Sequence, residues 1–141
     1  MDKPSPRTTT TVRATVPFLS GDAQSELLEG LLVFDPADPF AVVMRLEARS
    51  GTVVWTFARE LLAEGLYTPS GDGDVQVWPC LSQNGSAVVI IELSSPDGTA
   101  ILQAPSRTIS RFLGDTEKVV PSGEESPHLL LDSLITRLLA S

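Results

Sequence analysis

An alternation of apolar and polar side chains over residues 41–48 places the strongest constraint on the fold. The apolar positions are Val42, Met44, Leu46 and Ala48. Arg45 and Glu47 fall between them. A period of two puts alternate side chains on opposite faces of a β-strand. The segment therefore predicts a strand with one face in the core.

Three neighbouring segments extend this pattern. Residues 11–18 alternate, with Val12, Ala14, Val16 and Phe18 on one side. Residues 26–34 are mostly apolar, and Gly30 in their middle favours a strand over a helix. The "RSG" sequence at 49–51 predicts a hairpin connection into a strand whose core positions are Val53, Trp55 and Phe57. Four strands in succession indicate an antiparallel meander.

The apolar period then changes from two to three or four. Ala58, Leu61, Leu62 and Leu66 predict a short helix over 58–66. Strand patterns follow at 74–81, 87–95 and 99–104, with a turn at "SPDG", 95–98. Ser106 is the predicted cap of a helix over 107–117 with an apolar face of Ile109, Phe112 and Leu113. Asp132 is the predicted cap of a last helix with Leu131, Leu134, Ile135 and Leu138 on one face.

This order of elements predicts an α+β fold. We expect antiparallel sheets of about seven to eight strands, one internal helix and C-terminal helices. Residues 1–10 are predicted to be a flexible N-terminal tail, and residues 11–141 a single domain.

Charge argues against a nucleic-acid role. The net charge is −8, and after residue 20 seven basic and 17 acidic residues leave −10. Such a surface repels phosphate backbones. The longest apolar runs, among them Ala87 to Ile91, are too short to span a membrane, and the N-terminus has no apolar signal segment. With a single cysteine, the chain is predicted to be cytoplasmic.

The Gly-Asp-Gly-Asp stretch at 71–74 is the one loop that suggests a ligand. It lacks the lysine of a phosphate loop and the later ligands of a calcium loop. Two glycines and two short acidic side chains are typical of a sharp turn. We expect a corner that leads from the helix ending near Leu66 into the strand starting near Asp74, with no metal or cofactor bound.

No catalytic constellation is evident. His128 is the only histidine, and its surroundings predict a solvated loop residue. Cys80 has no basic neighbour, which predicts a buried, inert thiol. The chain is therefore not expected to be an enzyme, and binding to other proteins is the expected role.

Four residues are candidates for contact with a protein partner. Arg59, Glu60 and Glu64 have the pattern of an exposed helix face. Trp78 shares its side of a strand with Asp74 and Gln76. An outward tryptophan either covers a neighbouring element or anchors an interface, and the sequence leaves both open.

Three segments carry a resemblance to a known family. They are "DPFAV", "WTFARELLAEGLYTPSGDGDVQVWP" and "LSSPDGTAILQAP". The chain resembles the SsgA-like proteins of sporulating actinomycetes over nearly its whole length after the first 25 residues.

The resemblance implies a role in cell division. Members of this family act in sporulation-specific septation, where they mark septum sites and recruit the tubulin-like protein FtsZ together with SsgA-like partners. It also implies a homotrimer at division septa, no catalysis, and a fold like that of the "whirly" single-stranded nucleic-acid-binding proteins. That likeness supplies the alternative function, a single-stranded nucleic-acid binder, which the net charge of −8 disfavours.

Overall fold

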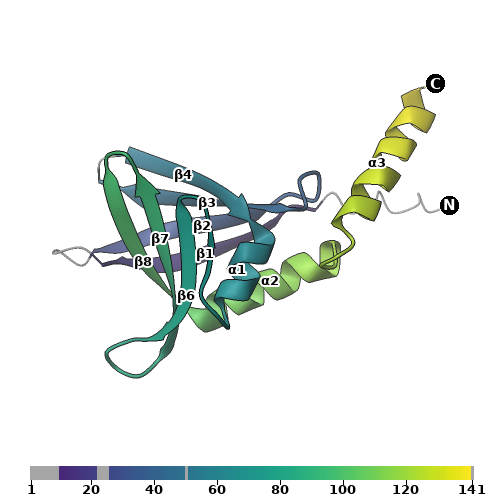
Figure 1. Ribbon diagram of the computed structural model, residues 1–141. Helices are drawn as coiled ribbons and strands as arrows, with labels where there is room; N and C mark the ends of the chain where they lie inside the picture. Colours follow the sequence, from purple (N-terminus) through teal and green to yellow (C-terminus); the bar gives the residue numbers. More distant parts are fainter. Residues whose placement is uncertain (1–9, 22–25, 50, 141) are drawn as a thin grey trace.

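The computed structural model describes residues 10–21, 26–49 and 51–140, and these form eight strands and three helices (Figure 1). The predicted α+β class is confirmed. In chain order the elements are β1 (Val12–Ser20), β2 (Leu27–Phe34), β3 (Ala41–Ala48), β4 (Gly51–Ala58), α1 (Arg59–Gly65), β5 (Ser70–Asp72), β6 (Val75–Leu81), β7 (Ala87–Ser95), β8 (Gly98–Pro105), α2 (Ser106–Val119) and α3 (Glu125–Ala140). Residues 1–9 of the predicted tail lie outside the described residues.

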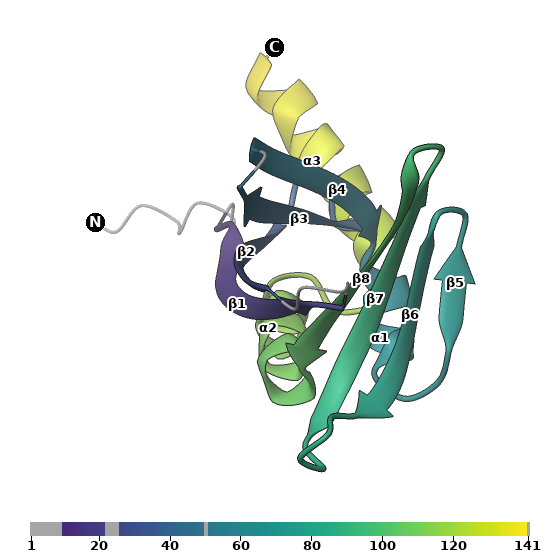
Figure 2. The same cartoon turned by 90° about the vertical axis from the view of Figure 1, so that its left-hand side faces the viewer.

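All eight strands belong to one antiparallel sheet, in the order β4-β3-β2-β1-β8-β7-β6-β5. Among the described residues, the two halves of the sheet, β1–β4 and β5–β8, are joined by a short pairing of β1 with β8. Its register pairs Leu19 with Gln103 and Ser20 with Leu102. Because this seam is short, the sheet curls there and the halves face each other (Figure 2).

The apolar faces of the two halves form the core. The predicted alternations of β1 and β3 are confirmed: Val16 and Phe18 on β1 are fully buried, as are Val42 and Met44 on β3. From α2, the predicted residues Ile109, Phe112 and Leu113 close the core. At the far end the halves diverge around a cavity of about 460 Å³ that Val53 and Trp55 line. Val53, predicted to be a core residue, is therefore 39% exposed.

Three local predictions are wrong. The Gly-Asp-Gly-Asp stretch is the tip of a β5–β6 hairpin, in which Asp72 pairs with Val75 and Gly73 has a φ of 59°. Ser106 is the first residue of α2 and makes no cap, because the chain leaves β8 directly into the helix at Pro105. Asp132 lies inside α3, which begins seven residues earlier at Glu125.

Two glycines are required by close packing. A Cβ on Gly30 would overlap the ring of Phe18, and a Cβ on Gly65 would overlap the side chain of Val77. The first contact holds β2 against β1, and the second seats α1 on β6. Gly114, within α2, meets nothing within 4 Å.

Replacement of these glycines by alanine should therefore have opposite effects. Overpacking in Gly65→Ala should lower the free energy of unfolding by about 1–3 kcal/mol. Gly114→Ala should raise it by about 0.5–1 kcal/mol, because alanine loses less backbone entropy in a helix. Urea unfolding followed by circular dichroism measures both. Equal stability of the two variants would contradict the packing described.

Candidate functional site

The outward face of β6, β7 and β8 forms a grid of nine side chains, which we call the outer face. Cross-strand register sets its three rows: Cys80, Val88 and Pro105; Trp78, Ile90 and Gln103; Gln76, Glu92 and Ile101. Ile90, at the centre, lies between Trp78 and Gln103 and is only 8% exposed. Val88 and Ile90 are buried without belonging to the main core. The outer face is thus a second, smaller apolar surface on the opposite side of the sheet.

A groove of about 700 Å³ runs along the outer face. Its apolar wall is formed by Leu19, Val88, Ile90, Ile101 and Pro105. Its polar wall is the β6–β7 loop, which contributes Ser82, Gln83, Asn84 and Ser86. The Gly85 amide donates to the Ser82 carbonyl at 2.9 Å, and the Ser82 amide to the Ser86 carbonyl at 2.8 Å, so this wall is a closed turn. An apolar centre beside a polar rim is the usual composition of a protein-contact surface, and the apolar and polar walls of this groove match it.

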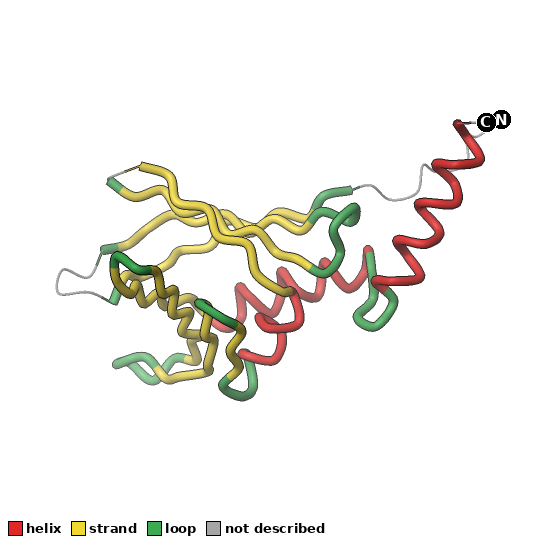
Figure 3. Tube along the Cα trace, turned by 45° about the horizontal axis from the view of Figure 1, so that its top comes forward, coloured by secondary structure: helices red, strands yellow, loops and turns green. Residues whose placement is uncertain are grey.

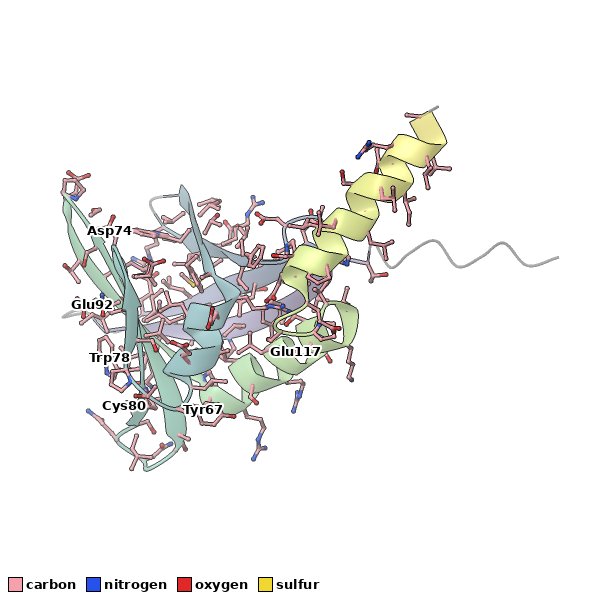
Figure 4. All side chains as sticks on the ribbon, turned by 45° about the vertical axis from the view of Figure 1, so that its right-hand side comes forward. Tyr67, Asp74, Trp78, Cys80, Glu92 and Glu117 are labelled. Carbon is pink, nitrogen blue, oxygen red and sulfur yellow. The ribbon has the colours of Figure 1, made fainter. Side chains whose placement is uncertain are left out.

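The segment that builds this surface carries one sign of charge. Residues 60–106 contain six carboxylates and no lysine or arginine. They are Glu60, Glu64, Asp72, Asp74, Glu92 and Asp97. Glu92 lies on the outer face itself, and Asp74 at the β5–β6 turn (Figure 4). A polyphosphate chain would be repelled along all of β5–β8.

The four predicted contact residues do not form one surface. Gly65 of α1 packs against Val77, and the next residue along β6, Trp78, points to the other side of the strand. Glu60 and Glu64 are exposed on α1, whereas half-buried Trp78 lies on the outer face beside Cys80 (Figure 4). Trp78 covers Ile90 and remains partly accessible, so both roles considered for it are compatible with its position.

Arg59 is not an exposed contact residue, and this prediction is wrong. Its side chain is 2% exposed. Its Nη1 donates to the Val120 carbonyl at 2.7 Å, and its Nη2 pairs with Glu125 Oε2 at 2.8 Å. Weaker bonds reach the carbonyl and hydroxyl of Thr116, and Phe34 lies under the guanidinium, 4.8 Å from Cζ to the ring centroid. Arg59 therefore ties the start of α1 to the end of α2 and the start of α3.

Glu125 and His128, both near the start of α3, fix this helix to the rest of the molecule. Burial raises the pKa of Glu125, but the hydrogen bond from Arg59, two backbone amides and the Arg59 charge outweigh it, and the pKa lies below its ordinary value. His128 Nε2 lies 2.8 Å from the Pro36 carbonyl and 3.2 Å from Asp132 Oδ2. Its side chain is mostly buried, so the predicted solvated loop histidine is in fact a contact between α3 and the β2–β3 turn.

The Arg59–Glu125 pair makes stability depend on pH. Glu125→Gln should lower the free energy of unfolding by about 2 kcal/mol at neutral pH, because a charge-assisted bond is lost. Since the folded pKa is lowered, the stabilising effect is complete above about pH 4.3 and disappears as pH falls through the folded value. Urea unfolding of the unsubstituted protein and of Glu125→Gln, from neutral to acid pH, measures this stabilising effect. If the two proteins differed in free energy of unfolding by the same amount at acid as at neutral pH, the stabilising role of the Arg59–Glu125 pair would be contradicted.

The described residues offer little for catalysis. Cys80 is exposed rather than buried, and its Sγ donates a hydrogen bond to the neighbouring Leu81 carbonyl at 3.4 Å. Within residues 10–21, 26–49 and 51–140, no three His, Cys, Asp or Glu side chains form a group that could hold a metal ion. No helix in that part of the chain is long and apolar enough to cross a membrane.

A sequence signal for the outer face was present in the run "AVVII", residues 87–91. A strand with one solvated face alternates, whereas an unbroken apolar strand has both faces covered. Val89 and Ile91 enter the core, and Val88 and Ile90 enter the outer face. The pattern that excluded a membrane span thus also indicated a second apolar surface.

Comparison with known proteins places the chain in a family. The family model "Streptomyces sporulation and cell division protein, SsgA" matches residues 28–125. The sporulation-specific cell division protein SsgB of Streptomyces coelicolor is 49% identical over 110 residues, 77% of this chain and 80% of that one. SsgB of Salinispora tropica is 43% identical over 94% of both chains.

Two solved structures share the fold. One, described as "Mutations in SsgB correlate to longitudinal cell division during sporulation of Streptomyces coelicolor", has a TM-score of 0.79 at 44% identity and covers 84% of this chain and 95% of that one. The other, an SsgA-like sporulation-specific cell division protein from Thermobifida fusca, has a TM-score of 0.82 at 31% identity over 97% and 98%. The resemblance found in the sequence is therefore confirmed: this chain belongs to the SsgA family of sporulation and cell division proteins, and its relatives include several SsgB proteins.

Proposed function

We propose that this protein is a non-catalytic regulator of cell division that localises to sporulation septum sites in the cytoplasm and recruits FtsZ through protein contacts. Family membership supports the role in sporulation-specific division. The step to FtsZ rests on the resemblance together with a surface built for protein contact and no catalytic constellation among the described residues.

The outer face is the observation that carries the proposal. The groove has an apolar wall and a polar wall, and half-buried Trp78 lies next to it, paired across the strands with Ile90 of its lining. An apolar centre with an aromatic residue and a polar rim has the composition of a binding hot spot. Trp78 can provide a large contact area at the cost of ordering few torsions. The flanking Glu92 and Asp74 would favour partner segments that carry no excess negative charge.

A filament offers many identical sites, which favours a recruiter with more than one contact. We propose that several copies of this chain, or a copy with an SsgA-like partner, bind neighbouring FtsZ subunits at once. Each further contact is then intramolecular, so the overall affinity exceeds that of one outer face. The homotrimer implied by the family resemblance would provide such an arrangement.

Single-stranded nucleic-acid binding is not favoured as a second function. Such proteins combine a basic groove with stacking aromatic side chains. Here the strands β5–β8 carry only acidic charge, and Trp78 is the only aromatic residue of the outer face. A likeness in fold does not by itself provide the lysine and arginine side chains that a nucleic-acid-binding groove needs.

Substitution of Trp78 tests the proposal. Trp78→Ala should weaken co-sedimentation with FtsZ polymers about 30-fold, as expected for loss of a hot-spot aromatic residue. The effect should come from partner contact, so the melting temperature of the variant must be measured alongside.

Tyr67→Ala is the matched control. Tyr67 is also aromatic and is 82% exposed, but it follows α1, on the other side of β6 from the outer face (Figure 4). Its removal should leave co-sedimentation unchanged. Failure of the unsubstituted protein to pellet with FtsZ would overturn the proposed function, and equal weakening by both substitutions would overturn the assignment to the outer face.

A further inference from the structure

The first half of α2 carries two cations on an acidic protein. Arg107 and Arg111 are both exposed, and because they lie four residues apart, their side chains project from the same face of the helix. After residue 20 the chain has seven basic residues against 17 acidic ones. Like charges at this spacing repel each other and destabilise a helix. A bound anionic group would reverse that cost.

Most other basic side chains of the described residues already have an acidic partner. The ion pairs are Arg45–Glu47, Arg49–Glu26, Arg59–Glu125 and Lys118–Asp115. Asp115 lies one turn beyond Arg111, but its Oδ1 pairs with Lys118 Nζ at 3.6 Å. In the described part of the chain, no carboxylate pairs with Arg107 or Arg111. Both guanidinium groups are therefore available to a partner.

A small pocket lies against the first of these two cations. It forms where the chain leaves α1 beside the start of α2, and Tyr67 marks the place (Figures 3 and 4). Its lining is Leu66, Tyr67, Ser106, Arg107 and Ser110. Tyr67 is 82% exposed and Leu66 half-buried, so an aromatic and an aliphatic side chain border the pocket. We call this pocket together with Arg107 and Arg111 the arginine site.

The size of the pocket indicates what can enter it. Its volume is about 230 Å³. Sites for small-molecule ligands are larger, at about 300–1,000 Å³. The pocket therefore suits one apolar side chain of a larger partner rather than a separate small molecule.

The charge of the rest of the chain limits the partner further. A membrane surface or a nucleic acid presents anions over a wide area, and would also meet the exposed Glu60 and Glu64 of α1 and a net charge of −8. Each cation near an anionic membrane contributes only about 1 kcal/mol, so two do not offset this repulsion. A short acidic segment of a protein touches the arginine site alone. Guanidinium groups also match the two-oxygen geometry of carboxylates.

We propose that the arginine site binds a short segment of another protein in which carboxylates lie next to one apolar side chain. The carboxylates accept hydrogen bonds from Arg107 and Arg111, and the apolar side chain enters the pocket beside Tyr67. Tyr67 lies on the other side of β6 from the outer face, so this partner is additional to the one proposed there. The inference holds or fails whether or not FtsZ binds the outer face.

A titration of the full chain with two matched peptides tests the proposal. The probes are acetyl-Glu-Glu-Leu-Glu-amide and its uncharged counterpart acetyl-Gln-Gln-Leu-Gln-amide. The acidic peptide should shift the amide NMR signals of residues 66–67 and 106–111, and the uncharged peptide should shift them much less. Added salt should weaken the binding, because the two cations are exposed.

Charge reversal separates the arginine site from the net charge of the protein. Arg107→Glu/Arg111→Glu should weaken binding of the acidic peptide about tenfold, as expected for the loss of two exposed ion pairs. Arg45→Glu/Arg49→Glu makes the same change of charge at two exposed arginines of the β3 region and should leave binding unchanged. Tyr67→Ala should weaken it about fivefold, because one side of the pocket is lost. Melting temperatures establish that the variants are folded.

Four outcomes would overturn the proposal. They are equal shifts by the two peptides, an absence of shifts at residues 66–67 and 106–111, equal weakening by the two double substitutions, and tighter binding to phosphatidylglycerol vesicles than to the acidic peptide. The last result would assign the two arginines to a membrane surface. Light scattering provides a further check, because a change of mass in Arg107→Glu/Arg111→Glu alone would show that the site joins copies of this chain instead.

Discussion

The buried guanidinium of Arg59 is the interaction on which the arrangement of the helices depends. It sits where β4 becomes α1, over the ring of Phe34, and it donates to the last carbonyls of α2 and to Glu125 of α3. Almost no water reaches it, so each of these acceptors offsets part of the cost of removing a charge from solvent. One side chain thereby joins the sheet to three helices. Removal of Glu125 alone leaves the cation with weaker partners, whereas removal of the cation would leave the carboxylate and the carbonyl ends unpaired.

The short seam between β1 and β8 is the second constraint. In the part of the chain that the structure describes, two residue pairs and one further hydrogen bond, from the Gly21 amide to the Ile101 carbonyl, join the halves there. The sheet bends at this short seam and encloses its own core. The bend leaves one apolar surface of the sheet inside the core and a second apolar surface on the outside. Val89 and Ile91 face inward, whereas Val88 and Ile90 remain outside with Trp78. The curvature that completes the core thus also produces the groove for which we propose a protein partner.

Local periodicity in the sequence was enough to predict most strands and all three helices, the last with its start too late, since side chains such as Val42 and Met44 record which face is buried. It was not enough to find β5, whose three residues are too few to show a period. Arg59 was misjudged for a different reason: its burial depends on Thr116, Val120 and Glu125, at least 57 residues away, and no local pattern reports such contacts. Trp78 was placed on the correct side of its strand by parity, but the groove beside it needs β1, β7 and β8 together. The leucines of α3 were visible in the sequence, whereas their degree of exposure was not.

We propose that the protein acts by contact through the outer face of β6–β8. Hydroxyl-radical footprinting of the free chain and of the chain bound to FtsZ polymers tests this most directly, because it reports individual side chains. Our account predicts that labelling of Trp78 and Cys80 falls on binding while that of Tyr67 does not change. Labelling of Trp78 and Cys80 that is the same in the bound and free chain would contradict it.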